Sequence, residues 1–405
     1  MRVGVLGGGL QGCCVALALA ERGVEVTLFD RNGFLISKAG AANEGKIHLG
    51  YMYAGDPTLR TAERMLRGAL AFAPFLKRHL GKSPRALATS IPAAYVVHRD
   101  SQQSPEQVWH YLNQVHDLIE EASPSEAKVY FGTDLAIRPR RWSAGERGNC
   151  FNPEVALDAV DTCEVAINPA QVAQAFRDCI AANPRIETRL GFNVVNVDEG
   201  NGLRVVARAA GDDVQESFDH VVNALWDGRL ALNQAVGIDL GRPWLHRLKY
   251  GVSFRLPEAA EVPPSATFVL GPFGEVVSYG NGLTYLTWYP ECLHDISQAV
   301  TPPDWPTYPG EPLRSRILSG TLAAMADIVP SLRGLDPSTL PEAIVKGGAI
   351  VALGETDIYD PESELHKRYE IGVTSKGRFH SIDPGKLTMA PFFADECTER
   401  IFALG

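Results

Sequence analysis

The sequence predicts an α/β fold: a Rossmann-like dinucleotide-binding domain built from separated segments, with an inserted α+β domain whose sheet is mostly antiparallel. Residues 3–22 read as a short apolar strand, a G-x-G-x-x-G turn and a helix. Helix and strand patterns return at about residues 163–235 and at the C-terminus. Strand patterns separated by Gly and Pro turns fill 250–289 between them. A nucleotide domain interrupted by a second domain explains this order.

The glycine motif at the start of the chain predicts a phosphate-binding turn. Gly7, Gly9 and Gly12 form G-x-G-x-x-G, and Leu10 and Gln11 fill its two variable positions before the last glycine. The first glycine permits a tight turn, the second lets the backbone approach a pyrophosphate, and the third lets helix and strand pack closely. The N-terminus of the following helix directs unpaired N–H groups at the anion.

An acid follows the second strand at the position that a dinucleotide site requires. The strand Val24–Phe29 ends at Asp30, which is followed by Arg31. Its distance from the glycines, about 20 residues, is typical of the acid that binds a ribose 2′-hydroxyl. A carboxylate would repel a 2′-phosphate, so the pattern favours FAD or NAD over NADP.

Composition excludes several classes of function. The chain of 405 residues has a formal net charge of −10, which disfavours a nucleic-acid partner. It contains no apolar run of the ~18 residues that a membrane-spanning helix needs. The seven cysteines are scattered and without C-x-x-C spacing, and the histidines show no zinc motif, so we expect neither disulfides nor a metal site. These features favour a cytoplasmic protein.

Helices are indicated by spacing and by capping residues. Apolar residues recur at helical intervals over 58–80. Ser104 and Gln107 flank a proline in a capping-box pattern, and Asn168 followed by Pro169 repeats the same logic. We therefore expect helices that begin at these residues.

The strand patterns of the second domain are short and bounded by turns. Four of them lie between residues 250 and 289, and they favour antiparallel pairing. They are 250–256, 266–270, 276–279 and 284–289.

Three groups of residues resemble the flavin-dependent D-amino acid oxidase superfamily, which includes glycine oxidase, sarcosine oxidase and 2-hydroxyglutarate oxidase. The first is the glycine motif with Asp30. The second, Ala41–Tyr53, is similar to a flavin loop with the pattern I-H-x-G-x-x-Y. The third comprises Glu164–Pro169, His220–Trp226 and the G-K-L-T turn Gly385–Thr388. The similarity covers most of the nucleotide domain.

The resemblance implies FAD as the cofactor. It implies an FAD-binding domain formed by 1–90, 160–235 and 346–405, and a substrate domain formed by 91–159 and 236–345. By similarity, the backbone near Val194 meets the adenine and Ala224 lies near the pyrophosphate. The implied cofactor contacts are Gly7, Gly9, Leu10, Gln11, Gly12, Asp30, Arg31, Asn43, Gly45, Lys46, Ile47, His48, Val194, Ala224, Gly385, Lys386, Leu387 and Thr388.

Enzymes of this superfamily pass a hydride from a carbon bearing an amine or hydroxyl to flavin N5, and a guanidinium commonly binds the substrate carboxylate. Arg378, shortly before the G-K-L-T turn, is the favoured anchor. His48 is expected beside the flavin as a hydrogen-bonding group, a base or a covalent tether. His380 is the alternative base. Tyr51 is a further candidate; it and Tyr53 alternate with apolar residues, so we expect one of the two to face the site while the other packs.

The sequence thus predicts an FAD-dependent oxidoreductase that oxidises a C–N or C–O bond of a small anionic substrate. Three alternatives remain open at this stage: an NAD-dependent dehydrogenase, a non-catalytic FAD-binding protein, and a tailoring domain that acts on a larger carrier or, against the acidic charge balance, on RNA. The residues also leave open whether oxygen, a quinone or a partner protein reoxidises the flavin.

Overall fold

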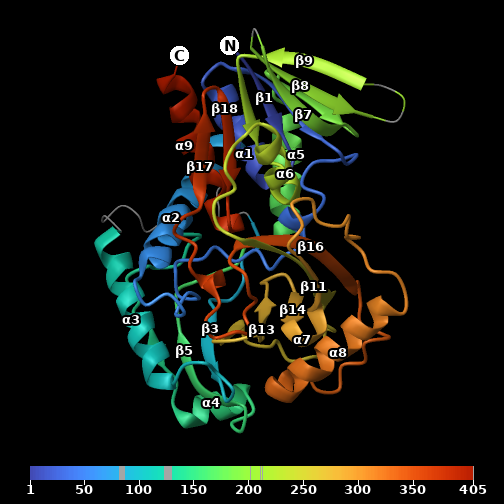
Figure 1. Cartoon of the computed structure of the whole chain (residues 1–405). Helices are drawn as coiled ribbons and strands as arrows, with labels where there is room; N and C mark the ends of the chain where they lie inside the picture. Colours follow the sequence, from blue (N-terminus) through green and yellow to red (C-terminus); the bar gives the residue numbers. More distant parts are fainter. Residues whose placement is uncertain (82–86, 123–129, 201, 210, 212, 405) are drawn as a thin grey trace.

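The computed structural model describes residues 1–81, 87–122, 130–200, 202–209, 211 and 213–404. Two sheets divide the chain into an upper and a lower part, and both termini lie at the top of the upper part (Figure 1). The predicted fold class is confirmed: one sheet is mostly parallel and Rossmann-like, and the other is mostly antiparallel.

The upper sheet has the order β17-β18-β10-β1-β2-β6, and only the β17–β18 pair is antiparallel. Its strands are β1 (Arg2–Leu6), β2 (Glu25–Asp30), β6 (Ile186–Leu190), β10 (His220–Asn223), β17 (Gly372–Lys376) and β18 (Phe379–Asp383). The central strands are nearly continuous apolar runs buried on both faces, as parallel strands usually are. Their carboxyl ends meet at one edge, where ligands bind in open α/β sheets.

Helices cover one face of the upper sheet, and the opposite face packs against a small antiparallel meander described below. Helix α1 (Leu10–Glu21) is buried almost throughout because it also packs against α9 (Ala390–Ala403). The long helix α2 (Arg60–Leu80) confirms the prediction for 58–80 and accommodates a proline in its interior. Two further helices are α3 (Pro105–Ala122) and α5 (Pro169–Ala181).

The predicted helix caps are confirmed. The Asn168 side chain accepts hydrogen bonds from the backbone N–H groups of Ala170 and Gln171 at the start of α5. Before α3, the Ser104 hydroxyl accepts from the Gln107 N–H at 3.3 Å, and the Gln107 side chain accepts from the Ser104 N–H at 2.8 Å. These bonds satisfy donors that the first turn leaves free.

The lower sheet has the order β15-β11-β14-β13-β12-β3-β5-β4, with β16 paired to the other edge of β11. All its pairs are antiparallel except β3 with β12. The strands are β3 (Ala94–His98), β4 (Arg140–Arg141), β5 (Ala156–Asp161), β11 (Trp244–Arg255), β12 (Ala266–Val269), β13 (Gly274–Ser278), β14 (Leu283–Trp288), β15 (Leu293–Ser297) and β16 (Ile344–Leu353). Helices α4 (Ala144–Cys150), α6 (Arg229–Ala235), α7 (Tyr289–Cys292) and α8 (Leu313–Ile328) complete the described helices.

One predicted boundary needs correction. The segment from 346 was assigned to the nucleotide domain, yet β16 pairs with β11 along ten residues of the lower sheet. This strand passes directly beneath the nucleotide domain (Figure 1), but its backbone hydrogen bonds are made with β11, so it belongs to the lower sheet. A Cβ on Gly348 would lie 2.6 Å from the Ala39 Cα, so the two domains touch through bare backbone here.

A small antiparallel meander stands beside the upper sheet (Figure 1). It consists of β7 (Asn193–Gly200), β8 (Gly202–Arg208) and β9 (Asp213–Phe218). The apolar sides of its strands pack on Leu6, Phe29 and Phe379 of the upper sheet. This packing brings the start of β7 to the carboxyl edge of that sheet.

Candidate active site

One cavity of about 570 Å³ lies between the two sheets. It begins at the turn between β1 and α1, follows the carboxyl ends of β2 and β10, and ends among residues of β11, β13 and the turn before α9. A phosphate-binding turn at one end and charged side chains at the other make it a candidate site for a long ligand.

The phosphate-binding turn has the backbone that its glycines require. Gly7 has φ +104°, a conformation that side chains disfavour. A Cβ on Gly12 would lie only 1.8 Å from the Gly7 carbonyl oxygen, so helix and turn can approach only without one. A Cβ on Gly9 would meet no protein atom within 4 Å. Gly9 lines the cavity, so its bare face is the space that a pyrophosphate would take.

Asp30 lines the cavity next to this turn. Its carboxylate accepts hydrogen bonds from the Gly8 N–H at 2.7 Å, from the Asn32 N–H at 2.7 Å and from the Asn32 amide at 2.8 Å. These bonds fix the carboxylate at the end of β2, where a ribose hydroxyl could donate to its remaining lone pairs.

Most of the expected cofactor residues lie around the cavity. Those that line it are Gly7, Gly9, Leu10, Gln11, Asp30, Arg31, Asn43, Lys46, His48, Val194, Ala224, Gly385, Lys386 and Leu387. Gly12, Gly45, Ile47 and Thr388 lie behind the wall and support it. The sequence motifs therefore converge on one site, although cofactor contacts themselves stay a prediction.

The residues behind the wall fix the loop that carries His48. A Cβ on Gly45, which has φ +72°, would lie 1.9 Å from the Ile167 carbonyl oxygen. The Thr388 hydroxyl accepts from the His48 N–H at 2.9 Å and donates to the Lys46 carbonyl at 3.4 Å. The G-K-L-T turn is thereby bonded to the I-H-x-G loop.

His48 lies between two carboxylates. Its Nδ1 is 3.4 Å from Glu164 Oε1, and its Nε2 is 3.9 Å from Glu44 Oε1. Among the described residues neither ring nitrogen has a hydrogen-bond partner, although the side chain is 1% exposed. Tyr95 and the Leu49 N–H each donate to Glu164 at 2.7 Å. A polar group of a ligand could therefore form a hydrogen bond with a ring nitrogen of His48.

Nearby cations keep both carboxylates ionised. Burial alone would raise the pKa of Glu44, but Lys249, Lys386 and His48 hold this pKa at about 2. Burial likewise opposes ionisation of Glu164, and His48 and Lys46 outweigh it, so its pKa lies below the usual value.

The far end of the cavity is rich in cations, three of them buried and two partly buried. Arg247, Lys249, Arg368 and Lys386 line it together with Lys46. Lys46 is paired with Glu275 at 2.7 Å, and Arg247 is paired with Asp357 at 2.7 Å. In the described part of the chain, the remaining three form no ion pair with a carboxylate.

Arg368 and Lys386 keep capacity for an anion. The Arg368 guanidinium donates to the carbonyls of Gly385 at 2.7 Å and Leu365 at 3.0 Å. Burial and the nearby Arg368 lower the pKa of Lys386 to about 8. An anionic ligand would relieve this repulsion.

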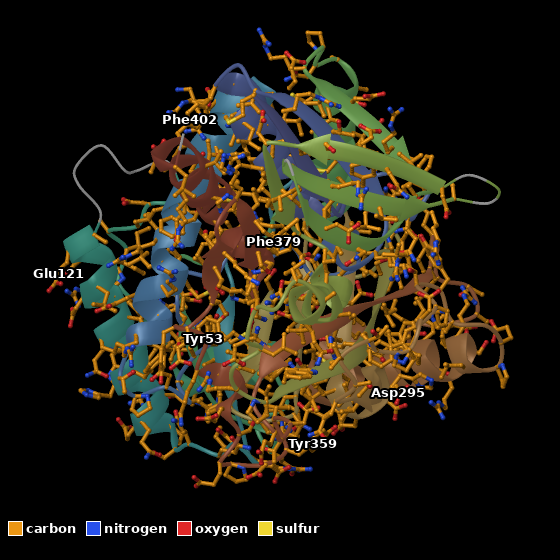
Figure 2. All side chains as sticks on the ribbon, turned by 45° about the horizontal axis from the view of Figure 1, so that its top comes forward. Tyr53, Glu121, Asp295, Tyr359, Phe379 and Phe402 are labelled. Carbon is orange, nitrogen blue, oxygen red and sulfur yellow. The ribbon has the colours of Figure 1, made fainter. Side chains whose placement is uncertain are left out.

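The aromatic rings of Tyr53 and His366 follow His48 in sequence of contact along the site. The Tyr53 ring lies 5.9 Å from the His48 ring and 6.1 Å from the His366 ring. Figure 2 labels Tyr53 in the interior of the molecule. Its hydroxyl has no partner within the described ranges, and burial raises its pKa. Burial and Arg368 lower the pKa of His366 to about 3, so this histidine is neutral.

Three residues expected in catalysis lie away from the cavity. Arg378 is exposed in the hairpin between β17 and β18. His380 is buried within β18, where it bonds to His220 at 3.1 Å and Ser375 at 2.9 Å. The Tyr51 hydroxyl bonds to His116 Nδ1 at 3.2 Å. Arg378 precedes the first residue of β18, whereas the residues that follow its carboxyl end line the cavity, so the strand separates Arg378 from the site.

Sequence reasoning missed Glu44, Glu164, Arg247, Lys249 and Arg368. Two of these gave a usable signal: Arg247 and Lys249 are alternate residues of one otherwise apolar strand, so they share a face. The carboxylates became recognisable only when the fold brought them to His48.

The described residues also bear on membrane-spanning segments and metal sites. No helix in these ranges is long and apolar enough to cross a membrane. Within the same ranges, no group of three or more His, Cys, Asp or Glu is arranged to hold a metal ion.

One long cavity lies between a Rossmann-like sheet and a second sheet, with a phosphate turn at one end and ionisable groups at the other. This arrangement defines a dinucleotide-dependent oxidoreductase. Residues 2–289 match the model of the DAO family, described as FAD dependent oxidoreductase. The chain belongs to this family, and its cofactor is FAD. The predicted resemblance to the D-amino acid oxidase superfamily is confirmed, and the NAD-dependent alternative is not retained.

Solved structures share the fold over nearly the whole chain. Glycine oxidase from Geobacillus kaustophilus has a TM-score of 0.68 at 14% identity, with 98% of this chain and 95% of that chain covered. Iminodiacetate oxidase from Chelativorans sp. BNC1 has a TM-score of 0.66 at 14% identity, with 100% and 96% covered. L-alpha-glycerophosphate oxidase from Mycoplasma pneumoniae, solved with FAD bound, has a TM-score of 0.64 at 15% identity, with 99% and 94% covered.

A curated relative is the tRNA 5-methylaminomethyl-2-thiouridine biosynthesis bifunctional protein MnmC from Paraburkholderia phytofirmans. It is 25% identical over 286 residues, which cover 69% of this chain. The chain spans only 38% of the length of that protein.

Proposed function

We propose that this chain oxidises a C–N or C–O bond of a small anionic substrate by hydride transfer to FAD. The observation that carries the proposal is the set of cations at the end of the cavity opposite the phosphate turn, where Arg368 is buried and Lys249 and Lys386 are partly buried. Burying a charge is costly unless it is paired, so a buried Arg368 without a carboxylate partner favours an anionic ligand.

The cofactor fits the cavity from the phosphate turn to the G-K-L-T turn. The bare face of Gly9 would admit the pyrophosphate, and Asp30 would accept from the ribose. When bound, FAD supplies a hydride acceptor that takes two electrons from the substrate. The backbone from Gly385 to Leu387 would adjoin its ring.

We assign substrate binding to Arg368. Its planar guanidinium matches the geometry of a carboxylate or phosphate better than the ammonium group of a lysine does. Lys249 and Lys386 would add charge without fixed geometry. The low exposure of His48 means that a bound substrate would react away from bulk water, where electrostatic contacts are stronger.

His48 would accept the proton that the substrate heteroatom loses, and Glu164 would hold the ring from the other side. This pair would serve either alternative: a hydroxyl loses its proton as its carbon loses the hydride, and an ammonium must lose a proton before its carbon can lose the hydride.

The proposal is tested by anaerobic mixing of the holoenzyme with amino acids, 2-hydroxy acids and phosphorylated alcohols, each beside a neutral amide, ester or unphosphorylated analogue. Bleaching of the flavin absorption by one acid but not by its neutral analogue is the expected result. Equal bleaching by both members of a pair, or by none of the compounds, would contradict the proposal. His48→Gln should slow reduction by a hydroxy acid about 100-fold, within the usual contribution of a general base.

A further inference from the structure

The segment that joins β16 to β17, residues 354–371, forms part of the cavity wall. It supplies Ile358, Leu365, His366 and Arg368 to the lining, yet its regular structure is limited to one short 3₁₀ turn. Connections of this length in compact domains are usually functional, and active-site lids are common among them. We refer to residues 354–371 as the bridging segment.

A buried but half-made ion pair fastens the bridging segment to the lower sheet. Arg247 Nη1 donates to Asp357 Oδ1 at 2.7 Å, and the two side chains are only 4% and 9% exposed. The Ile358 N–H donates to the same oxygen at 2.6 Å. In the described part of the chain, Arg247 Nε and Asp357 Oδ2 are buried without any hydrogen-bond partner.

This geometry is incomplete for an arginine–carboxylate pair. Such pairs frequently form two parallel hydrogen bonds, and here one donor and one acceptor stay unused. A buried polar atom without a partner carries a desolvation penalty, so the contact is weaker than its burial suggests. The cavity side of Arg247 is open, because Arg247 itself lines the cavity.

The end of the bridging segment is held by buried bonds of Arg368, whose N–H donates to the Thr61 hydroxyl at 2.9 Å, whereas the acidic residues of the segment make exposed contacts. Arg242 lies 3.0 Å from Glu370 and 3.6 Å from Glu364, and the acidic side chains are about half exposed. Such surface pairs contribute little to stability. Tyr359 is 51% exposed and lies near the edge of the molecule in Figure 2. The Arg247–Asp357 pair is therefore the main buried polar tie of this segment to β11.

We propose that Asp357 is a built-in competitor for Arg247, which an anionic substrate displaces so that the first part of the bridging segment, residues 354–363, is released while Arg368 stays in place. The inference rests on the proposed function in one respect, the anionic ligand. Exchange of one carboxylate for another leaves Arg247 paired, whereas a neutral molecule would leave a buried guanidinium without a counterion. The Arg247–Asp357 pair thus makes entry of a substrate depend on the negative charge of that substrate.

The test uses the FAD-loaded enzyme with acetate as the probe, and calorimetry measures the dissociation constant. Asp357→Asn should bind acetate at least ten-fold more tightly than the wild type, because the competing charge is gone. The matched control is Asp158→Asn, which breaks the Arg141–Asp158 pair of 2.7 Å elsewhere in the same sheet. The control should bind acetate as the wild type does.

A second measurement needs no variant. Acetate should increase proteolytic cleavage within 354–363 of the wild-type holoenzyme, and acetamide at equal concentration should not. Unchanged or weaker acetate affinity in Asp357→Asn, or equal cleavage with acetate and acetamide, would overturn the proposal. Neither measurement requires turnover, so a failure to oxidise any acid would count against the proposed function alone.

Discussion

Gly9→Ala should separate cofactor binding from folding. Gly9 has φ −70° and ψ −179°, which alanine adopts without strain, and an added Cβ meets no protein atom within 4 Å. The protein without FAD should therefore be as stable as the wild type. It could gain about 0.4–1 kcal/mol, because alanine restricts the unfolded chain.

The same methyl group would occupy the space assigned to the pyrophosphate. A hydrogen bond to a charged group contributes about 1.5–3 kcal/mol, and about 1.4 kcal/mol corresponds to a tenfold change in affinity. Loss of one such backbone contact should weaken FAD binding about ten- to hundredfold.

Fluorescence titration of the apoprotein with FAD measures the affinity, and urea unfolding measures the stability. Gly12→Ala is the comparison, because its Cβ would lie 1.8 Å from the Gly7 carbonyl oxygen and the backbone must move. This variant should lose about 1–3 kcal/mol of stability as well as FAD affinity. Wild-type FAD affinity in Gly9→Ala would refute the assignment of the pyrophosphate to this turn.

Three further predictions follow from the charges. Arg368→Met should raise the KM for an anionic substrate about 100-fold, and an unchanged KM would remove Arg368 from the substrate site. Above pH 8 the wild-type KM should rise as Lys386 loses its proton, since its pKa is about 8. The variant Lys386→Met should lack this rise. An identical rise in the variant would mean that another group causes it. The pKa of His380 is lowered from 6.5 to about 4 by burial and His220, so below pH 6.5 the unfolded chain binds the proton more readily. Stability measured by urea unfolding should fall from pH 6.5 towards 4, and less so in His380→Gln; equal slopes would place the acid sensitivity elsewhere.

Much of the nucleotide domain was predictable because its signals are local. Backbone conformation dictates Gly7, close approach dictates Gly12, and capping chemistry dictates Ser104 and Asn168. The position of β16 was not predictable, because its pairing partner β11 lies about 100 residues earlier in the chain. A strand pattern alone does not identify which sheet the strand joins.

The catalytic end of the site was less predictable for the same reason. His48 was identified from its motif, whereas Glu164 meets it only through tertiary packing. Arg368 lies in a segment with little regular structure and no periodicity, so no sequence pattern distinguishes it from Arg378. Direction along β18 decided between them: its carboxyl end reaches the cavity, and Arg378 lies before its first residue.

The absorption spectrum of the purified protein, repeated on the supernatant after acid precipitation, tests the central claim most directly. The account predicts two flavin bands that acid releases as FAD. Colour retained in the pellet would indicate a covalent tether, with His48 as the first candidate. A colourless protein that takes up no FAD on reconstitution would contradict the account.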